Sequence, residues 1–235
     1  MPGRYSLTDP KATMELLFGV ECPAERPLHN IAPTWYVPVV RHAASGGLEA
    51  VMMRWGLVPR WVRKITEGAK LHNARCETLA EKRTFRGPFA KRRCLLPLDS
   101  FFVWYEHEKQ KVPYRISLTG GRPFACAGLW ERWTAPGHEE SAEGGMLSCT
   151  LVTTATMSAL AHLDSRMPVI LDPADHAAWL DLGASAVDLD VLLRPCPAER
   201  LALHEVSARV NSHVNDDPAC LDPLRTLFDH GLDGA

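Results

Sequence analysis

Six stretches of β-type sequence run through most of this chain, and helices do not alternate with them in a regular way. Short apolar runs rich in branched and aromatic residues, bounded by Gly, Pro or charged residues, are typical of antiparallel strands joined by turns. The stretches are HNIAPTWYVPVVRH, AVMMRWGLV, CLLPLDSFFVWYEH, VPYRISLTG, PFACAGLWERW and MLSCTLVTTAT. Because a βαβ pattern is missing, we expect an α+β fold with a curved, barrel-like antiparallel core.

Short helices are expected at three places around this core. KATMELLFGV and MSALAHL carry apolar residues at helical spacing, and DPADHAAWLDL begins with Asp172 as a helix cap and Pro173 in the first turn. The polar segment TAPGHEESAEGG is expected to form an exposed hairpin loop. A chain of 235 residues can bury one large core, so we expect a single domain over residues 1–235.

Charge and composition exclude several classes of protein. The 26 Lys and Arg against 28 Asp and Glu give a formal charge of -2, which argues against coating nucleic acid by charge alone and leaves room for a local basic groove. The chain has no membrane-spanning run and its polar start is unlike a signal peptide, so we expect a cytoplasmic protein with no membrane partner. Because HExxH, P-loop and GxGxxG motifs are missing, no metal or cofactor is predicted. The seven cysteines are odd in number and widely spaced, which indicates reduced thiols.

Three polar clusters lie where predicted strands meet turns, and such places commonly carry functional residues. They are the N-terminus, the segment HNARCET and the segment HLDSRMPVIL, with the candidate residues Pro2, Arg4, His72, Asn73, Arg75, Cys76, Glu77, Thr78, His162, Asp164 and Arg166. Each also has a purely structural interpretation. Asn-x-Arg is common in turns and surface ion pairs, Asp164 can cap a turn or pair with Arg166, and Cys76 is either an activated thiol or a small buried apolar residue.

Aromatic and basic residues alternate in the segment RWGLVPRWVRK. Such a loop can stack on unpaired bases while its cations hold phosphates. We expect a mixed arrangement, with Trp55 in the core and Trp61 exposed. A basic stretch follows that, taken alone, is typical of a solvated face: Arg83, Arg86, Lys91, Arg92 and Arg93.

The order of several motifs along the chain is more specific than any single one. They are NIAPT, WGLVPRW, NARCET, CLLPLDSFFVW, FACAGLWE, RMPVIL, VSARVN and VNDDP. This series, which covers nearly the whole chain, resembles the SOS response-associated peptidase (SRAP) family, which guards abasic sites in single-stranded DNA. The resemblance implies a compact α+β fold with a barrel-like core and a positively charged groove for single-stranded DNA.

The resemblance also implies a particular chemistry. In the family, removal of methionine exposes an N-terminal cysteine, which condenses with the aldehyde of an abasic sugar to form a stable thiazolidine crosslink. An asparagine, a glutamate and a histidine assist this reaction. The name peptidase refers to the same cysteine, which would release its own N-terminal extension.

This chain departs from the family at three of those chemical positions. Pro2 stands where the family has its cysteine, and Val103 stands where the family has the glutamate of Gly-x-x-Glu-Trp. Asp164 stands where the family has a histidine, four residues before the proline of Arg-Met-Pro. His162 lies two residues before Asp164 and could substitute for that histidine only in a rearranged loop.

The residues that the resemblance assigns to DNA binding are kept. Asn73 of the Asn-Ala-Arg motif is the retained catalytic position, beside Pro2 and Asp164 at the altered ones. Guanidinium groups bind phosphate in a bidentate manner, and an exposed tryptophan can stack on an unpaired base. The residues at positions that match the family's DNA contacts are Arg4, Trp61, Arg75, Arg83 and Arg166.

Three functions remain open from the sequence. The first is binding of single-stranded or abasic DNA by a monomer that has lost the cysteine chemistry. The second is an abasic-site enzyme in which a free Pro2 amine, titrating near ~8, attacks the aldehyde to form an iminium ion. The third is a protein-interaction module on the same scaffold, which would replace the basic groove by an apolar or neutral surface.

Overall fold

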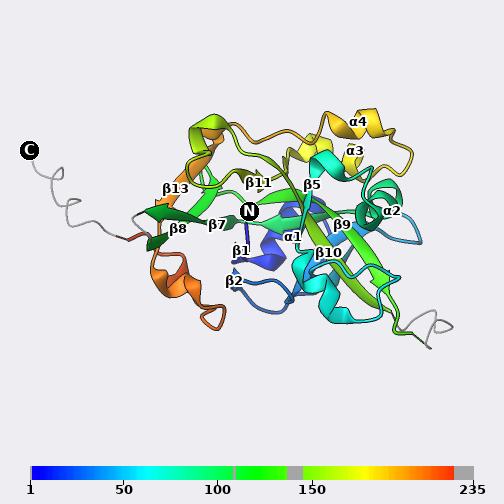
Figure 1. Cartoon of the computed structure of the whole chain (residues 1–235), viewed down its shortest axis with the longest axis horizontal. Coiled ribbons are helices and arrows are strands. Elements are labelled where there is room, and N and C mark those ends of the chain that lie inside the picture. The colour runs from blue at the N-terminus through cyan, green and yellow to red at the C-terminus, as the bar shows by residue number, and fades with distance from the viewer. Residues whose placement is uncertain (1, 108–109, 137–144, 225–235) are drawn as a thin grey trace, which may run out of the picture.

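The computed structural model in Figure 1 describes residues 2–107, 110–136 and 145–224. In this part of the chain, five strands close into a barrel. They follow the order β10-β4-β3-β6-β9, and β9 pairs with β10 to close the ring. The bounds are β3 (Tyr36–His42), β4 (Leu48–Trp55), β6 (Arg93–Leu98), β9 (Phe124–Trp133) and β10 (Met146–Ala155). The predicted α+β class and barrel-like core are therefore confirmed.

One feature of the barrel differs from the predicted antiparallel arrangement. β4 and β10 pair in parallel, and so do β10 and the short strand β5 (Asn73–Arg75), which makes the sheet mixed. Two further short strands extend the same sheet. β11 (Arg166–Pro168) pairs with β10, and β12 (Ile170–Leu171) pairs with β9.

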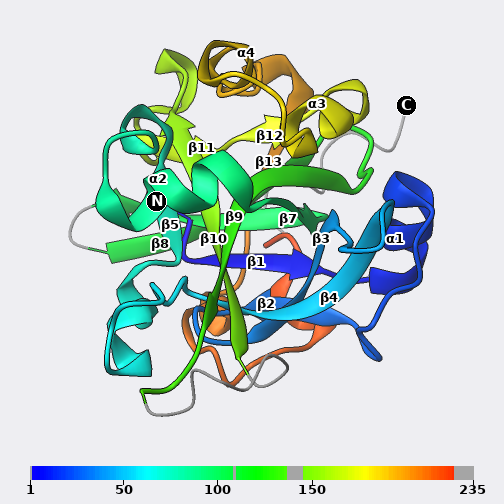
Figure 2. The ribbon, with the colours of Figure 1, turned by 90° about the vertical axis from the view of Figure 1, so that its right-hand side faces the viewer.

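A second sheet of five strands packs against the barrel. Its order is β13-β8-β7-β1-β2, and β1 and β7 lie near the centre of the molecule in both Figure 1 and Figure 2. Apolar residues of the two sheets share one core, in which the rings of Tyr5 and Trp55 meet edge to face at 4.9 Å between centroids. The bounds are β1 (Arg4–Leu7), β2 (Leu28–Ile31), β7 (Ser100–His107), β8 (Gln110–Leu118) and β13 (Leu201–Glu205).

Four short α-helices cover the outside of the barrel, where their apolar residues pack on outward-facing residues of β6 and β9. The predicted first helix is confirmed as α1 (Pro10–Phe18), which Asp9 caps by accepting a hydrogen bond from the backbone N–H of Ala12 at 3.0 Å. Gly19 ends α1 in the left-handed conformation that glycine adopts without strain. The others are α2 (Arg83–Lys91), α3 (His176–Leu180) and α4 (Ala186–Asp190).

The structure corrects two details of the predicted helices. MSALAHL forms only a 3-10 turn, Ser158–Leu160, because the chain has ten residues in which to leave β10 and return as β11. DPADHAAWLDL is helical as predicted, but the carboxylate of Asp172 binds Arg200 at 2.6 Å instead of capping the helix. Most of the predicted hairpin loop, residues 137–144, lies outside the described residues.

The basic stretch from Arg83 to Arg93 is only partly a solvated face. Arg83, Arg86 and Lys91 are exposed on α2, whereas Arg93 is buried, so the prediction was wrong for Arg93. Its guanidinium donates hydrogen bonds to the carbonyl oxygens of Phe89 at 2.5 Å, Ala90 at 3.1 Å and Trp179 at 2.6 Å, and to that of Asp181. One cation thus caps the C-terminal ends of α2 and α3, where unsatisfied carbonyls accumulate.

All seven cysteines are free thiols, as predicted. No described helix is long and apolar enough to span a membrane.

Candidate functional site

The start of the chain is held by the amide of Asn73. Asn73 begins β5, where it lies opposite Leu151 of β10, and its Nδ2 donates a hydrogen bond to the carbonyl oxygen of Pro2 at 2.7 Å. Pro2 is buried and leads into β1, whose first residue, Arg4, pairs with Phe102 of β7. The Oδ1 atom of Asn73 is also buried, and none of the described residues hydrogen-bonds to it. Asn73 and Pro2, predicted to act together, are therefore in direct contact.

Val103 and Asp164 line the same small cavity. Its volume of about 10 Å³ is room for one water-sized molecule, and most of its wall is apolar. The Oδ1 atom of Asp164 accepts a hydrogen bond from the backbone N–H of Arg166 at 3.0 Å, which is the turn-capping role that the sequence left open. The structure thus brings together the two positions at which the resemblance implies a glutamate and a histidine.

His162 does not line this cavity. Its side chain is exposed, and its ring lies edge to face against that of Tyr105, with the centroids 6.0 Å apart. In this arrangement the imidazole does not stand in for the histidine that Asp164 replaces.

Arg166 is held on the protein by two partners. Its Nη1 and Nη2 donate to the two carboxylate oxygens of Glu77 at 2.5 and 2.9 Å, and Nη2 also reaches the carbonyl oxygen of Thr153 at 2.6 Å. These hydrogen bonds lower the pKa of Glu77, so the carboxylate stays charged at neutral pH. A DNA phosphate would therefore compete with Glu77 for this guanidinium, and the sequence alone did not reveal that competition.

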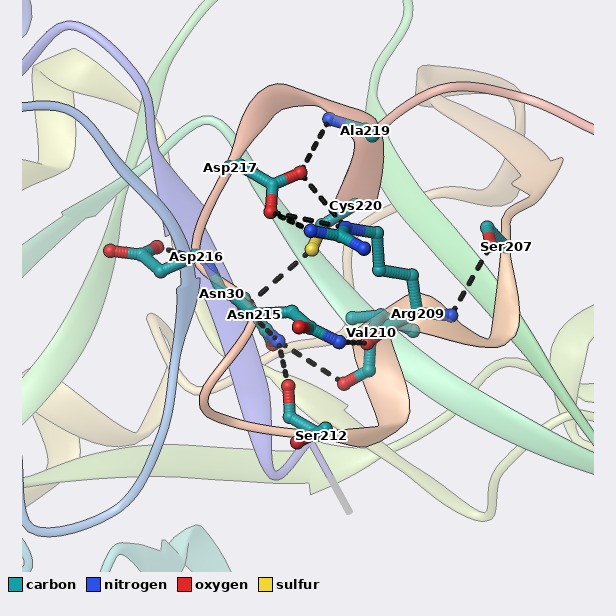
Figure 3. A network of polar contacts seen from close by, with 10 residues as sticks. All are labelled: Asn30, Ser207, Arg209, Val210, Ser212, Asn215, Asp216, Asp217, Ala219 and Cys220. Atoms are coloured by element: carbon teal, nitrogen blue, oxygen red, sulfur yellow. Dashed lines mark hydrogen bonds and ion pairs between the residues drawn. The ribbon is translucent and has the colours of Figure 1, made fainter.

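Arg4 is held by a separate polar network. Its Nη1 donates to Asn30 Oδ1 at 3.0 Å and to the carbonyl oxygen of Val210 at 2.8 Å, and partial burial lowers the pKa of Arg4. Figure 3 shows how the amide of Asn30 in turn binds the carbonyl oxygens of Val210, Ser212 and Asn215. The motifs VSARVN and VNDDP therefore supply backbone carbonyl oxygens that bind Arg4 and its partner Asn30. The sequence alone did not indicate this role.

Trp61 and Arg83 stack on each other at the surface. The Cζ atom of Arg83, the first residue of α2, lies 4.9 Å from the centre of the Trp61 ring. Trp61 is 40% exposed, whereas Trp55 is fully buried and donates from Nε1 to the carbonyl oxygen of His72 at 2.8 Å. The predicted division between a core tryptophan and an exposed one is confirmed.

Arg75 is exposed and makes no side-chain hydrogen bond or ion pair with the described residues. It lies opposite Thr153 in the pairing of β5 with β10, two residues from Asn73. The neighbouring thiol of Cys76 is half-buried, and burial raises its pKa, which fits a packed thiol and argues against an activated one. Among the described residues, no group of three His, Cys, Asp or Glu side chains is placed to hold a metal ion.

Comparison with known proteins identifies relatives over most of the chain. The chain is 37% identical over 199 residues to the abasic site processing protein YoqW of Bacillus subtilis, covering 83% of this chain and 86% of the relative. It is 30% identical over 240 residues to the abasic site processing protein HMCES of Mus musculus, covering 86% of this chain and 66% of that protein.

Solved structures show the same fold. A protein from Bacteroides thetaiotaomicron matches with a TM-score of 0.83 at 24% identity, covering 94% of this chain and 99% of the other. A protein from Bordetella bronchiseptica matches with a TM-score of 0.74 at 28% identity, covering 88% and 100%. The family model described as SOS response associated peptidase (SRAP) matches residues 1–213. This chain therefore belongs to the SRAP family.

Proposed function

We propose that this protein binds single-stranded DNA, including DNA with an abasic site, and does not form the cysteine crosslink implied by the family resemblance. The observation that carries the proposal is the contact of Asn73 with the carbonyl oxygen of Pro2 at 2.7 Å. Residue 2 is held beside the Asn-Ala-Arg motif, yet its side chain has no sulfur. The proposal is also supported by relatives named as abasic site processing proteins.

That the crosslink is not formed follows from the atoms that residue 2 provides. A thiazolidine contains a sulfur and a nitrogen on adjacent carbons, which cysteine provides and proline does not. The cavity next to Arg166 does not supply a replacement proton-transfer group, because Val103 has no titratable group and the carboxylate of Asp164 is hydrogen-bonded to backbone. We therefore expect a chain with these substitutions to bind DNA without forming the stable adduct, because it lacks the atoms for the ring.

The binding part of the proposal rests on exposed cations, one of which, Arg75, lies two residues from Asn73 in β5. Arg75 has donors that no described residue uses, and Arg83 lies over an exposed tryptophan. Guanidinium groups hold phosphates, and aromatic rings stack on bases without regard to sequence. These exposed cations also favour DNA over the third hypothesis, a protein-interaction module.

An Arg75→Ala variant is expected to bind single-stranded DNA more weakly, with a shallower dependence of affinity on salt. Loss of one phosphate contact reduces the slope of log K against log salt by about 0.7 for a single strand. Fluorescence anisotropy over a salt series measures both quantities. Arg122→Ala, which removes another exposed cation, from the turn between β8 and β9, is the control and should change neither. Equal affinities for the natural chain and Arg75→Ala would reject the proposed DNA site.

A second candidate function is catalysis by the Pro2 amine, and one observation favours it. The buried Oδ1 atom of Asn73 has no donor among the described residues, although the same amide contacts Pro2. Removal of Met1 would turn the Pro2 nitrogen into an N–H donor of the kind this oxygen lacks. The free amine would add to the abasic aldehyde and lose water to give an iminium ion. Removal of a proton from the sugar, for which Asp164 is the predicted base, would then expel the 3′ phosphate.

Borohydride trapping tests this candidate. Reduction of an iminium ion converts it to a stable amine, so the natural chain is expected to give a covalent adduct with abasic single-stranded DNA if Met1 is absent by intact mass. A variant with leucine inserted between Met1 and Pro2 keeps its methionine and should give no adduct. An unprocessed natural chain, or an adduct that survives the insertion, would remove Pro2 as the nucleophile.

A further inference from the structure

A basic hollow lies beside Trp61, whose ring lines it. Its volume is about 640 Å³, and it lies between the loop that follows β4 and the outer end of β9. Arg60 and Arg63 come from the loop, Arg92 from the end of α2, and Arg132 from β9. None of the family-matched residues Arg4, Asn73, Arg75 and Arg166 lines it.

Positive charge dominates this hollow. Among the described residues, four arginines line it against a single carboxylate, Glu131, in a chain whose formal charge is -2. That carboxylate is 3% exposed, and it accepts hydrogen bonds from Arg92 at 2.9 Å and from the backbone N–H of Arg132 at 3.1 Å. Arg60 and Arg63 are exposed and make no side-chain hydrogen bond or ion pair with the described residues. The described lining of the hollow therefore presents cations to solvent without a matching exposed anion.

Aromatic rings line the hollow between these cations. Trp61 forms one wall and also contacts Arg83, so the same ring borders both the hollow and the predicted DNA site. Trp130 forms another wall, and it is shared with a second hollow of about 310 Å³ that Arg41 and Lys91 line. Guanidinium groups beside an exposed aromatic ring, here Trp61, are the pattern of surfaces that track a single-stranded nucleic acid.

We infer that this hollow binds the sugar-phosphate backbone of the same single strand, beyond the nucleotides held at Asn73 and Arg75. The strand passes Trp61 and places further phosphates against Arg60 and Arg63. The inference rests on the proposed function, because it extends a strand that the first site must hold. It also predicts that affinity grows with the length of the oligonucleotide until the strand fills the hollow.

The test compares two lengths of DNA on the full chain. The probes are a short oligothymidylate of about 6 nucleotides and a long one of about 20, since single-strand sites of this kind span several to more than a dozen nucleotides. The variant is Arg60→Ala with Arg63→Ala, and the matched control is Lys11→Ala with Arg122→Ala, which removes two exposed charges elsewhere. We expect the long probe to bind the natural chain several-fold more tightly than the short one. The Arg60 and Arg63 variant should lose that gain, with a salt slope reduced by about 1.4 for the long probe and unchanged for the short one.

The other outcomes would contradict either the inference alone or both the inference and the proposed function. If the long probe gains nothing over the short one, or the variant behaves like its control, the inference fails while the proposed function stands. If neither probe binds the natural chain, both fail. If the variant instead weakens only a probe with a duplex next to the single strand, the hollow holds the paired strand and the inference as stated is wrong.

Discussion

A Pro2→Cys variant is expected to form a one-to-one covalent adduct with abasic single-stranded DNA, stable to heat and without a reducing agent. The substitution restores sulfur and nitrogen on adjacent carbons at the residue that Asn73 contacts at 2.7 Å. The natural chain is expected to give no such adduct, because an iminium ion formed by Pro2 hydrolyses unless it is reduced. Denaturing electrophoresis and intact mass measure the adduct, and mass also reports whether Met1 has been removed.

Two further substitutions are expected to speed this reaction. Asp164→His and Val103→Glu place titratable groups on the cavity that both positions line, and proton transfer by such groups contributes about a hundredfold or more to rates. Pro2→Ser is the control, since its hydroxyl does not form a stable ring with the aldehyde. A processed Pro2→Cys chain that binds the DNA and yields no adduct would show that residue 2 lies out of reach of the abasic sugar.

An Arg93→Met variant is expected to lose at least about 3 kcal/mol of unfolding free energy. Arg93 is 3% exposed and donates to carbonyl oxygens at the ends of two helices, and each buried acceptor that loses its donor costs about 1–3 kcal/mol. Methionine keeps most of the apolar volume, so the loss reports on the charge and its hydrogen bonds. Urea unfolding followed by circular dichroism gives the value.

Arg86→Met is the matched control for this stability change. Arg86 is exposed on the same helix, α2, and surface substitutions usually change stability by no more than about 0.5 kcal/mol. Equal unfolding free energies for the two variants would mean that water replaces Arg93 at the helix ends.

The longer strands were predictable because their apolar runs are long, whereas the assignment of strands to sheets was not, and short strands such as β1 and β13 were not predicted. CLLPLDSFFVWYEH reads as one strand, yet it contains β6 of the barrel and β7 of the second sheet. Asp99 lies between β6 and β7. Its carboxylate accepts hydrogen bonds from the hydroxyl of Ser6 and from the backbone N–H of Thr8, the latter at 2.5 Å. These partners are about ninety residues away along the chain, so local pattern carries no sign of them. Helix α2 was missed for a local reason, since Gly87 and Pro88 interrupt its pattern.

The candidate site was predictable in its residues and less so in their partners. Motif order led to Asn73 and Pro2, which the structure brings into contact. The ion pair of Arg166 with Glu77 joins segments 89 residues apart, and the contact of Arg4 with Val210 spans 206. Such pairings depend on the closed barrel and the C-terminal segment, and a sequence pattern contains information only about near neighbours.

The central place of β10 has a consequence for the newly made chain. β10 pairs with β4, β9, β5 and β11, and the last two carry Asn73 and Arg166. These two residues have no common support until β10 has joined the barrel, and non-local pairings of this kind form late because the intervening chain must first be ordered. A chain still emerging from the ribosome has neither β10 nor Arg166 in place. If the proposed function holds, engagement of DNA at this site would therefore begin only once the whole barrel is complete.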